Sequence, residues 1–156
     1  MIKIATLYRA ANGAMEPVKL DFTAEDFGIP ELEGPVHVHG KLLRVDEGIM
    51  LLIDKLEATQ NAHCSRCGKA LKLPLNFKPS EWLFYEEEAN EDDDSDERLQ
   101  LDTHRLELDP LEPVRQDILL NLETTPRCKK TCKKFEEAKE GDQGVKALAG
   151  LKDLVE

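Results

Sequence analysis

The four cysteines of this 156-residue chain fall into two close pairs, and no other feature constrains the fold as strongly. Two residues separate Cys64 from Cys67, three separate Cys128 from Cys132, and sixty lie between the pairs. Each step lets two thiolates from one turn reach one metal ion, and two such turns complete a tetrahedral four-sulfur site for Zn²⁺. The spacing therefore predicts one structural zinc site, with Cys64, Cys67, Cys128 and Cys132 as ligands, that joins two distant segments.

Two other interpretations of the cysteines stay open. The four residues can be ordinary reduced thiols, and a Cys-x-x-Cys pair also occurs in dithiol oxidoreductases. An oxidoreductase places its first cysteine at a helix N-terminus inside a βαβ pattern, whereas strand-like alternation flanks Cys64, and Gly68 follows Cys67. Glycine there permits a positive φ and leaves backbone N–H groups free to face the sulfurs, as in zinc knuckles. The zinc site is thus favoured over a redox pair.

A dense acidic run lies between the two cysteine pairs. Residues 86–97 contain nine acidic side chains and no basic one, so they carry most of the net charge of −11. Such a run repels itself and buries little apolar surface, which predicts a solvated loop. The alternative is an acidic surface that holds a basic protein or repels RNA.

Length and composition predict a single domain over residues 1–156. Hydrophobic residues make up 40% of the chain and aromatic residues only 5%, so Leu, Ile and Val must form the core. Within this domain we expect the acidic loop at about residues 86–97 and a loose polar segment at about 134–144.

Alternating apolar and polar residues predict an antiparallel sheet over about residues 36–108. In the first strand, Val36 and Val38 fall on one face, and His37 and His39 fall on the other. The strand patterns cover the segments 36–45, 49–59, 70–78, 82–86, 98–102 and 105–109. A hairpin or meander is the expected topology, with a barrel-like closure as the alternative.

Helical spacing of leucines predicts two C-terminal helices, near residues 110–123 and 145–155. Asp109 and Pro110 have the character of an N-cap and a first helical residue. A further short helix is expected after Thr23, following an extended piece. The fold class is therefore α+β: an antiparallel sheet with C-terminal helices packed on it, stapled by the four-cysteine zinc site.

Basic residues gather around both cysteine pairs of an otherwise acidic chain. They lower thiol pKa values and offset the negative charge of a zinc–tetrathiolate centre. The same residues form a candidate surface for the phosphates of RNA. They are Arg66, Lys69, Arg127, Lys129, Lys130, Lys133 and Lys134.

The sequence gives no positive reason to predict an enzyme. It contains no phosphate-binding glycine loop, no metalloprotease or serine-hydrolase motif and no pattern that suggests a small-molecule substrate. No apolar run approaches the roughly 20 residues of a membrane span, and the N-terminus has no secretory signal. We therefore expect a cytoplasmic protein, with no membrane partner and with its thiols reduced.

Several of these features, in this order, resemble the bacterial YceD family of 23S ribosomal RNA accumulation proteins. The shared features are the step Cys64-Ser-Arg-Cys67-Gly68, the acidic loop, a helix over residues 111–122, a cysteine pair after Thr125-Pro126 and a closing Leu-Ala-Gly-Leu-Lys-Asp-Leu. Many relatives carry further cysteines after the second pair. Here the corresponding residues 133–140 contain none, so a second metal site is not expected.

The resemblance implies a non-enzymatic ribosome-biogenesis factor that supports 23S rRNA accumulation and large-subunit assembly. Its expected partners are 23S rRNA or ribosomal proteins of the large subunit. The alternative is a structural zinc-knuckle adaptor that binds a basic ribosomal protein or another protein without touching RNA. A Cys-x-x-Cys thiol oxidoreductase is the third interpretation.

Overall fold

The computed structural model describes residues 1–86 and 98–128 of the chain. The chain forms two compact units: Met1–Asn61 with Lys72–Thr124, and Ala62–Leu71 with Thr125–Glu156. The predicted acidic loop beyond Glu86, the loose segment at 134–144 and the helix at 145–155 fall outside the described residues, and the single domain stays a prediction. The elements are β1 (Ile2–Lys3), α1 (Ala5–Tyr8), β2 (Met15–Thr23), α2 (Ala24–Phe27), β3 (Leu32–Val45), β4 (Gly48–His63), β5 (Ala70–Pro74), β6 (Ser80–Tyr85), β7 (Leu99–Gln100), β8 (Glu107–Leu108) and α3 (Leu111–Asn121).

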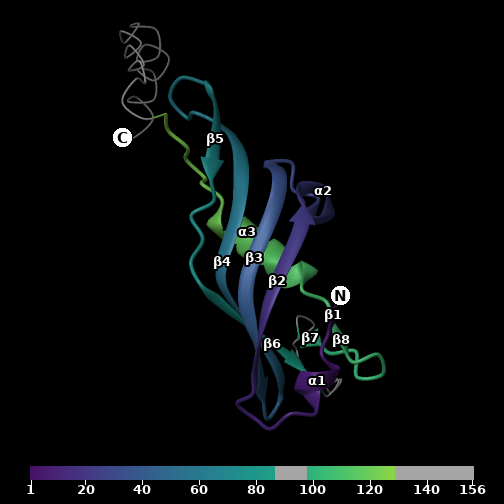
Figure 1. Cartoon of the computed structure of the whole chain (residues 1–156). Coiled ribbons are helices and arrows are strands. Elements are labelled where there is room, and N and C mark those ends of the chain that lie inside the picture. Colours follow the sequence, from purple (N-terminus) through teal and green to yellow (C-terminus); the bar gives the residue numbers. More distant parts are fainter. Residues whose placement is uncertain (87–97, 129–156) are drawn as a thin grey trace, which may run out of the picture. The chain divides into compact units, whose positions relative to one another are not determined.

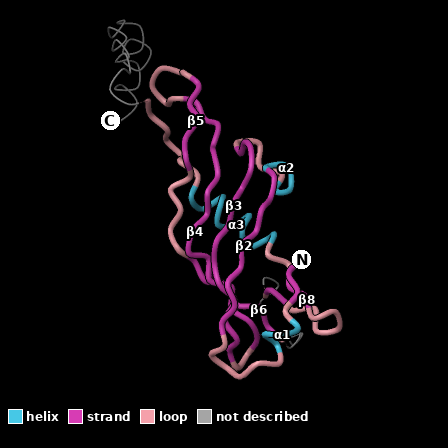
Figure 2. The backbone as a smooth tube through the Cα atoms, viewed as in Figure 1, coloured by secondary structure: helices cyan, strands magenta, loops and turns pink. Residues whose placement is uncertain are grey.

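Long antiparallel strands dominate the first unit, as the sequence alternation predicts (Figures 1 and 2). The strand order is β2-β3-β4-β6-β7, and β5 pairs with β4 beyond β6. A two-residue turn, Asp46-Glu47, joins β3 to β4 and sets their register, with Val45 opposite Gly48. Because β4 runs without a break from this turn to His63, it leads directly toward the first cysteine pair.

The sheet differs from the predicted one in three respects. It begins at Met15 rather than near residue 36, because β2 pairs with β3 along its whole length. It is mixed, since β7 runs parallel to β6, and β1 pairs with β8 in a separate two-stranded sheet. The predicted barrel-like closure is wrong for the described residues, because β2 and β7 stand at opposite ends of an open strand order.

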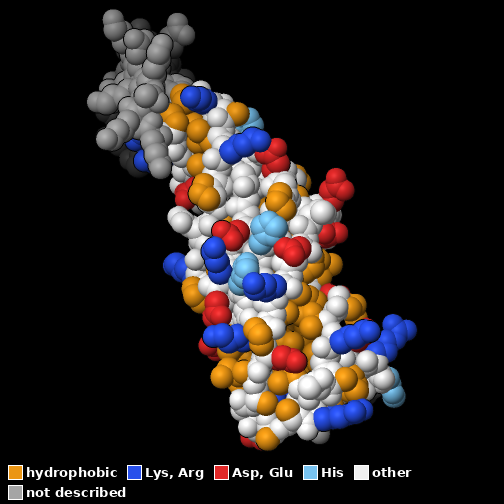
Figure 3. Space-filling view, in the orientation of Figure 1, with side chains coloured by type: hydrophobic (Ala, Val, Ile, Leu, Met, Phe, Trp, Pro, Cys, Tyr) orange, Lys and Arg blue, Asp and Glu red, His pale blue; other side chains and the backbone are white. Residues whose placement is uncertain are grey.

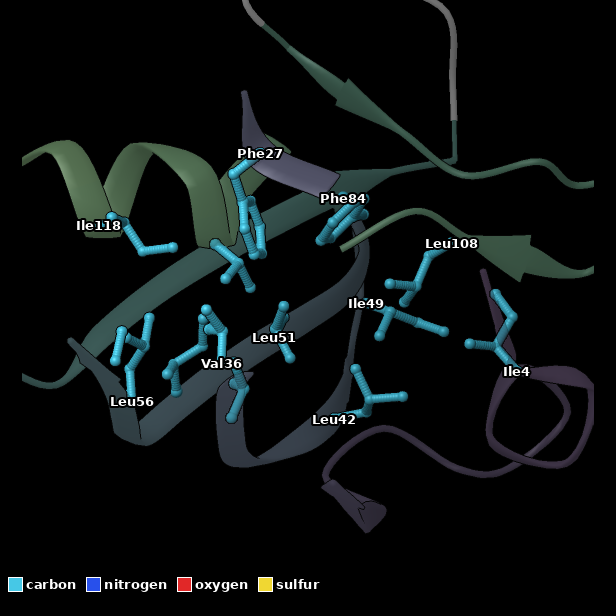
Figure 4. Close-up of a cluster of buried hydrophobic side chains, with 14 of the residues drawn as sticks. Ile4, Phe27, Val36, Leu42, Ile49, Leu51, Leu56, Phe84, Leu108 and Ile118 are labelled. Carbon is cyan, nitrogen blue, oxygen red and sulfur yellow. The ribbon is translucent and has the colours of Figure 1, made fainter. Parts of the chain in front are cut away.

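The core lies between one face of the sheet and α3. Side chains at alternate positions of β3 and β4 point into it, and Val36, Val38 and Leu51 are fully buried. From α3, Val114 and Ile118 join this core, four residues apart on one side of the helix. Figure 4 shows Ile118 extending from the helix toward the strands. Complete burial of side chains of this size contributes about 1.5–3 kcal/mol each. The predicted packing of a helix near 110–123 on the sheet is thus confirmed.

Side-chain carboxylates accept hydrogen bonds at the starts of α2 and α3; α2 begins after Thr23 as predicted, and α3 begins one residue later than predicted. Thr23 and Asp26 form a capping box at α2, in which the Asp26 carboxylate accepts from the Thr23 backbone N–H at 2.7 Å. At α3, the Asp109 carboxylate accepts from the Leu111 N–H at 3.1 Å, although the backbone N-cap is Pro110. These bonds satisfy N–H groups that a helix start leaves without partners.

The opposite face of the sheet is polar. His37 and His39 lie on it as expected, and the His37 imidazole shares a 2.6 Å hydrogen bond with Asp21 of the neighbouring strand. Figure 3 shows histidine, lysine and acidic side chains gathered over the middle of this face. No helix in the described part of the chain is long and apolar enough to cross a membrane.

Candidate metal centre

The first cysteine pair lies on a tight turn at the end of β4. The Cys64 N–H donates to the Lys69 carbonyl at 2.8 Å, and the Gly68 N–H donates to the Cys64 carbonyl at 2.9 Å. Gly68 has a φ of +69°, in the left-handed region that residues with a side chain rarely adopt. This is the glycine conformation that the sequence predicts for a zinc knuckle.

The second cysteine segment follows α3 and runs beside this turn. Leu122 ends the helix with an extended backbone (ψ 135°), and Pro126 prevents a return to helix. The Ser65 N–H donates to the Pro126 carbonyl at 2.8 Å, and the Cys128 N–H donates to Cys64 Sγ at 3.4 Å. These two hydrogen bonds, both donated by backbone N–H groups, link Cys128 to the Cys64 turn across 64 positions of sequence.

The sulfur atoms of Cys64, Cys67 and Cys128 all lie within 4.8 Å of one another. Between Cys67 and Cys128 the two Sγ atoms are 3.6 Å apart. A tetrahedral zinc site with Zn–S bonds of about 2.3 Å places its sulfurs about 3.8 Å apart. The three thiols therefore fit one metal ion, and the identity of the metal stays a prediction. Cys132, the predicted fourth ligand, lies outside the described residues.

Backbone N–H groups stabilise a thiolate at Cys64. Donation from the Cys128 N–H, and next from the Arg66 N–H, lowers the pKa of Cys64 to about 5, against the opposing effect of burial. A thiolate is the form that binds a metal. The knuckle thus supplies a deprotonated ligand in a site where only 2% of the Cys64 surface is exposed.

Only three of the seven residues of the predicted basic surface belong to the described part of the chain. Arg66, Lys69 and Arg127 are exposed, and within the described residues none of them has an ion-pair partner. All three belong to the two segments that carry the cysteines. The other four predicted residues, Lys129, Lys130, Lys133 and Lys134, lie outside the described part of the chain.

One buried side chain of the first unit, four positions before Cys64 in sequence, was not predicted. The Gln60 Nε2 donates to the Glu123 carbonyl at 3.2 Å, and the Glu123 N–H donates to Gln60 Oε1 at 2.9 Å. Gln60 is only 5% exposed. Its position in the alternation after Leu56 and Ala58, on the inward face of β4, is the sequence signal that identifies it.

Comparison with known proteins supports the resemblance found in the sequence. The sequence model of the family described as large ribosomal RNA subunit accumulation protein YceD matches residues 55–154, which include all four cysteines. No curated protein and no solved structure matches the chain significantly. Because the family match covers more than half of the sequence, this chain belongs to the YceD family.

Proposed function

We propose that this protein supports the accumulation of 23S rRNA during large-subunit assembly, as a binding factor rather than an enzyme. The observation that carries the proposal is the family match over residues 55–154, which suggests a role in accumulation of large-subunit ribosomal RNA. The matched region contains the second half of β4, all of α3 and both cysteine pairs. Depletion of the protein should therefore lower 23S rRNA relative to 16S rRNA, and unchanged 23S levels would contradict the proposal.

The metal centre in this proposal is structural. Cys64, Cys67 and Cys128 would hold the ion together with Cys132, and a bound Zn²⁺ would cross-link the two segments without taking part in chemistry. Native mass spectrometry of the full chain tests this assignment. One zinc per chain, lost in both Cys64→Ser and Cys128→Ser, is the expected result; metal retained in either variant would mean that the pairs do not share an ion.

The proposed RNA contact lies on the basic residues around the cysteines. Arg66, Lys69 and Arg127 are exposed and have no described acidic partner, so their charge is available to RNA phosphates. Changing these three to Ala, together with Lys129, Lys130, Lys133 and Lys134, should weaken binding to a 23S rRNA fragment and flatten its salt dependence.

A matched control distinguishes this surface from general charge effects. Lys19, Lys41 and Lys55 lie on β2, β3 and β4, and Lys41 and Lys55 are ion-paired with Asp54 and Glu57. Changing these three to Ala, compared with changing Arg66, Lys69 and Arg127, removes the same number of charges. Equal losses in the two triple variants would exclude the cysteine-flanking residues as a specific RNA surface.

A protein-binding adaptor is the second candidate, and the ends of the acidic run favour it. Arg44 binds the Glu86 carboxylate and lies 5.1 Å from the Tyr8 ring, and Arg98 lies 5.0 Å from the Tyr85 ring. Glu86 and Arg98, the residues at the two ends of the acidic run, thus each have a contact in the first unit, and we propose that the run itself binds a basic ribosomal protein. Capture of such proteins that survives nuclease treatment would favour the adaptor, and loss on nuclease treatment would favour RNA contact.

Thiol oxidoreduction is the remaining interpretation of the cysteine pairs. It requires turnover of a disulfide substrate that depends on Cys64 or Cys67. We expect no such turnover from the metal-loaded protein, because its thiolates are metal ligands in the proposed site. A standard insulin-reduction assay measures it.

A further inference from the structure

We infer that Gln60 is a positioning residue for the metal centre: its side chain fixes the segment that delivers Cys128 before any metal binds. The inference rests on the proposed metal centre. Gln60 and Glu123 are 63 positions apart in sequence and are joined by two hydrogen bonds. We call this pair of bonds the Gln60 clamp.

The clamp acts as a substitute for strand pairing. A strand neighbour donates one N–H to, and accepts one N–H from, the backbone of the residue opposite. The Gln60 amide does the same for Glu123, through its Nε2 and Oε1 atoms. The residue after α3 is therefore held as if it were paired to β4, although no strand forms there in the described chain.

Gln60 does not need its side chain to hold its own strand. Its Cα pairs with Leu32 in the β3–β4 ladder, and the next residue, Asn61, donates its N–H to the Glu31 carbonyl at 2.6 Å. Helix α3 also ends without the clamp, since the Asn121 amide donates to the Asp117 carbonyl at 2.8 Å. Of the parts that the clamp joins, only the segment after α3 lacks another such bond in these contacts, so loss of the clamp should affect that segment first.

The clamp lies next to the two chain connections that lead to the cysteines. Asn61 and Thr124 are the last residues of the first unit on these two connections, and each directly follows a clamped residue. Cys64 is four positions after Gln60, and Cys128 is five after Glu123. Because the clamp holds Gln60 and Glu123 together, the two chain connections begin side by side. This raises the effective concentration of one cysteine segment at the other.

This arrangement has a consequence for metal binding. In a chain without the clamp, the segment 123–127 would have to be ordered when the metal binds, and that conformational entropy would oppose binding. With the clamp, part of the ordering is complete in the metal-free protein. Loss of the clamp should therefore weaken metal binding at the cysteines without changing the ligands.

The sharpest test removes one backbone N–H, at the exposed residue Glu123. Glu123→Pro removes the N–H that Gln60 Oε1 accepts, and Leu122 already has the extended backbone that a residue before proline adopts. Glu123→Ala keeps that N–H and is the matched control. Zinc affinity of the full chain is measured by competition with a chromophoric chelator. We expect the dissociation constant to rise about tenfold or more for Glu123→Pro and to change less than about twofold for Glu123→Ala.

A second pair of variants tests the other partner. Gln60→Leu removes both bonds at nearly constant volume, and Gln116→Leu makes the same change at a glutamine on α3 that donates to Glu112 at the surface. Only Gln60→Leu should weaken zinc binding, at a temperature where amide spectra show the sheet intact. If Gln60→Leu fails to fold, the proline variant alone decides. Zinc affinity of Glu123→Pro equal to that of Glu123→Ala would overturn the inference.

A metal-independent measurement separates this inference from the metal assignment. In metal-free protein with Cys64→Ser and Cys132→Ser, Cys67 and Cys128 remain, with their sulfurs 3.6 Å apart. Oxidised glutathione converts the two thiols to one disulfide and releases two glutathione thiols. Glu123→Pro should slow this step several-fold relative to Glu123→Ala; equal rates would overturn the clamp. If the unaltered chain binds no zinc, the metal centre is rejected. The clamp is then tested by the rate of disulfide formation alone.

Discussion

Asp117 offers the clearest test of how the helix is held on the sheet. It is a carboxylate on α3 with only 3% of its surface exposed. Its Oδ2 accepts from the Ser80 hydroxyl at 2.5 Å and from the Trp82 indole N–H at 3.2 Å. Both donors belong to β6, so these bonds join helix to strand. Asp117→Asn keeps an acceptor and removes the charge, whereas Asp117→Ala removes both.

The two variants should differ in stability by a measurable amount. Bonds to a charged acceptor contribute about 1.5–3 kcal/mol each, and a buried donor left unpaired costs about 1–3 kcal/mol. In the alanine variant the Trp82 N–H keeps a weaker acceptor, Ser80 Oγ at 3.3 Å, and the cost of burying a charge disappears. We therefore expect Asp117→Ala to lower the free energy of unfolding by about 2 kcal/mol at pH 7, and Asp117→Asn to change it by less than about 1 kcal/mol.

The pH dependence has a definite sign. Burial raises the pKa of Asp117 above its ordinary value of 3.8, against the opposing effect of the Ser80 and Trp82 hydrogen bonds. Since its pKa is higher in the folded protein, Asp117 contributes stability below pH 3.8 that is lost as the pH rises through the raised value. The asparagine variant does not titrate. Its stability relative to the unaltered protein should therefore increase from pH 4 toward neutral pH.

Urea unfolding followed by tryptophan fluorescence and circular dichroism measures these differences. Trp82 is the single tryptophan of the chain and reports directly on this contact. An unchanged slope with urea would show that each substitution alters stability rather than the unfolded state. The reasoning would be refuted if Asp117→Asn lost as much stability as Asp117→Ala at pH 7, with a difference from the unaltered protein that stayed constant with pH.

Three further substitutions test other parts of the structure. Gly68→Ala should weaken the knuckle by about 1 kcal/mol, measured as zinc affinity, because its φ of +69° strains any residue with a side chain while no atom obstructs the added methyl. Gly40→Ala should lower the midpoint of urea unfolding more than any surface substitution, because its Cβ would lie 2.1 Å from the Leu52 carbonyl oxygen. Ile118→Ala should destabilise the first unit by about 2–5 kcal/mol in the same assay, since Ile118 is fully buried beneath the sheet.

The elements that could be predicted from sequence are those with a long periodic signal. In β3 and β4, apolar and polar residues alternate over many positions, because one face of the sheet packs against α3 and the other faces solvent. Helix α3 shows its apolar side through Val114 and Ile118. The pairs β1–β8 and β6–β7 could not be predicted, because β1, β7 and β8 have only two residues each, too few for a periodic pattern, and their pairing depends on the packing of the whole unit.

In the candidate site, too, one part could be predicted from the sequence and another could not. The proximity of Cys64, Cys67 and Cys128 could be predicted from their spacing. Cys64 and Cys67 are close enough in sequence to share one turn, and a metal ion shared between the two cysteine pairs requires Cys128 to lie beside that turn. The Gln60 clamp is different, since a glutamine on a strand gives no local sign of a partner 63 positions away. Only its inward position predicts that it must find hydrogen bonds, because buried amides in native proteins have partners.

The location of the low-pKa thiol distinguishes between the two chemical interpretations of the cysteines. A reactive cysteine combines thiolate character with access to its substrate, so a nucleophile should be both deprotonated and exposed. The thiol whose pKa is lowered to about 5 is Cys64, which is buried, whereas Cys67 is exposed. Its negative charge is stabilised by N–H groups of Cys128 and Arg66, one from each cysteine segment, so the charge depends on both segments being in place. A buried thiolate made by bringing two segments together suits a metal ligand, and an oxidoreductase would place that thiolate at the surface.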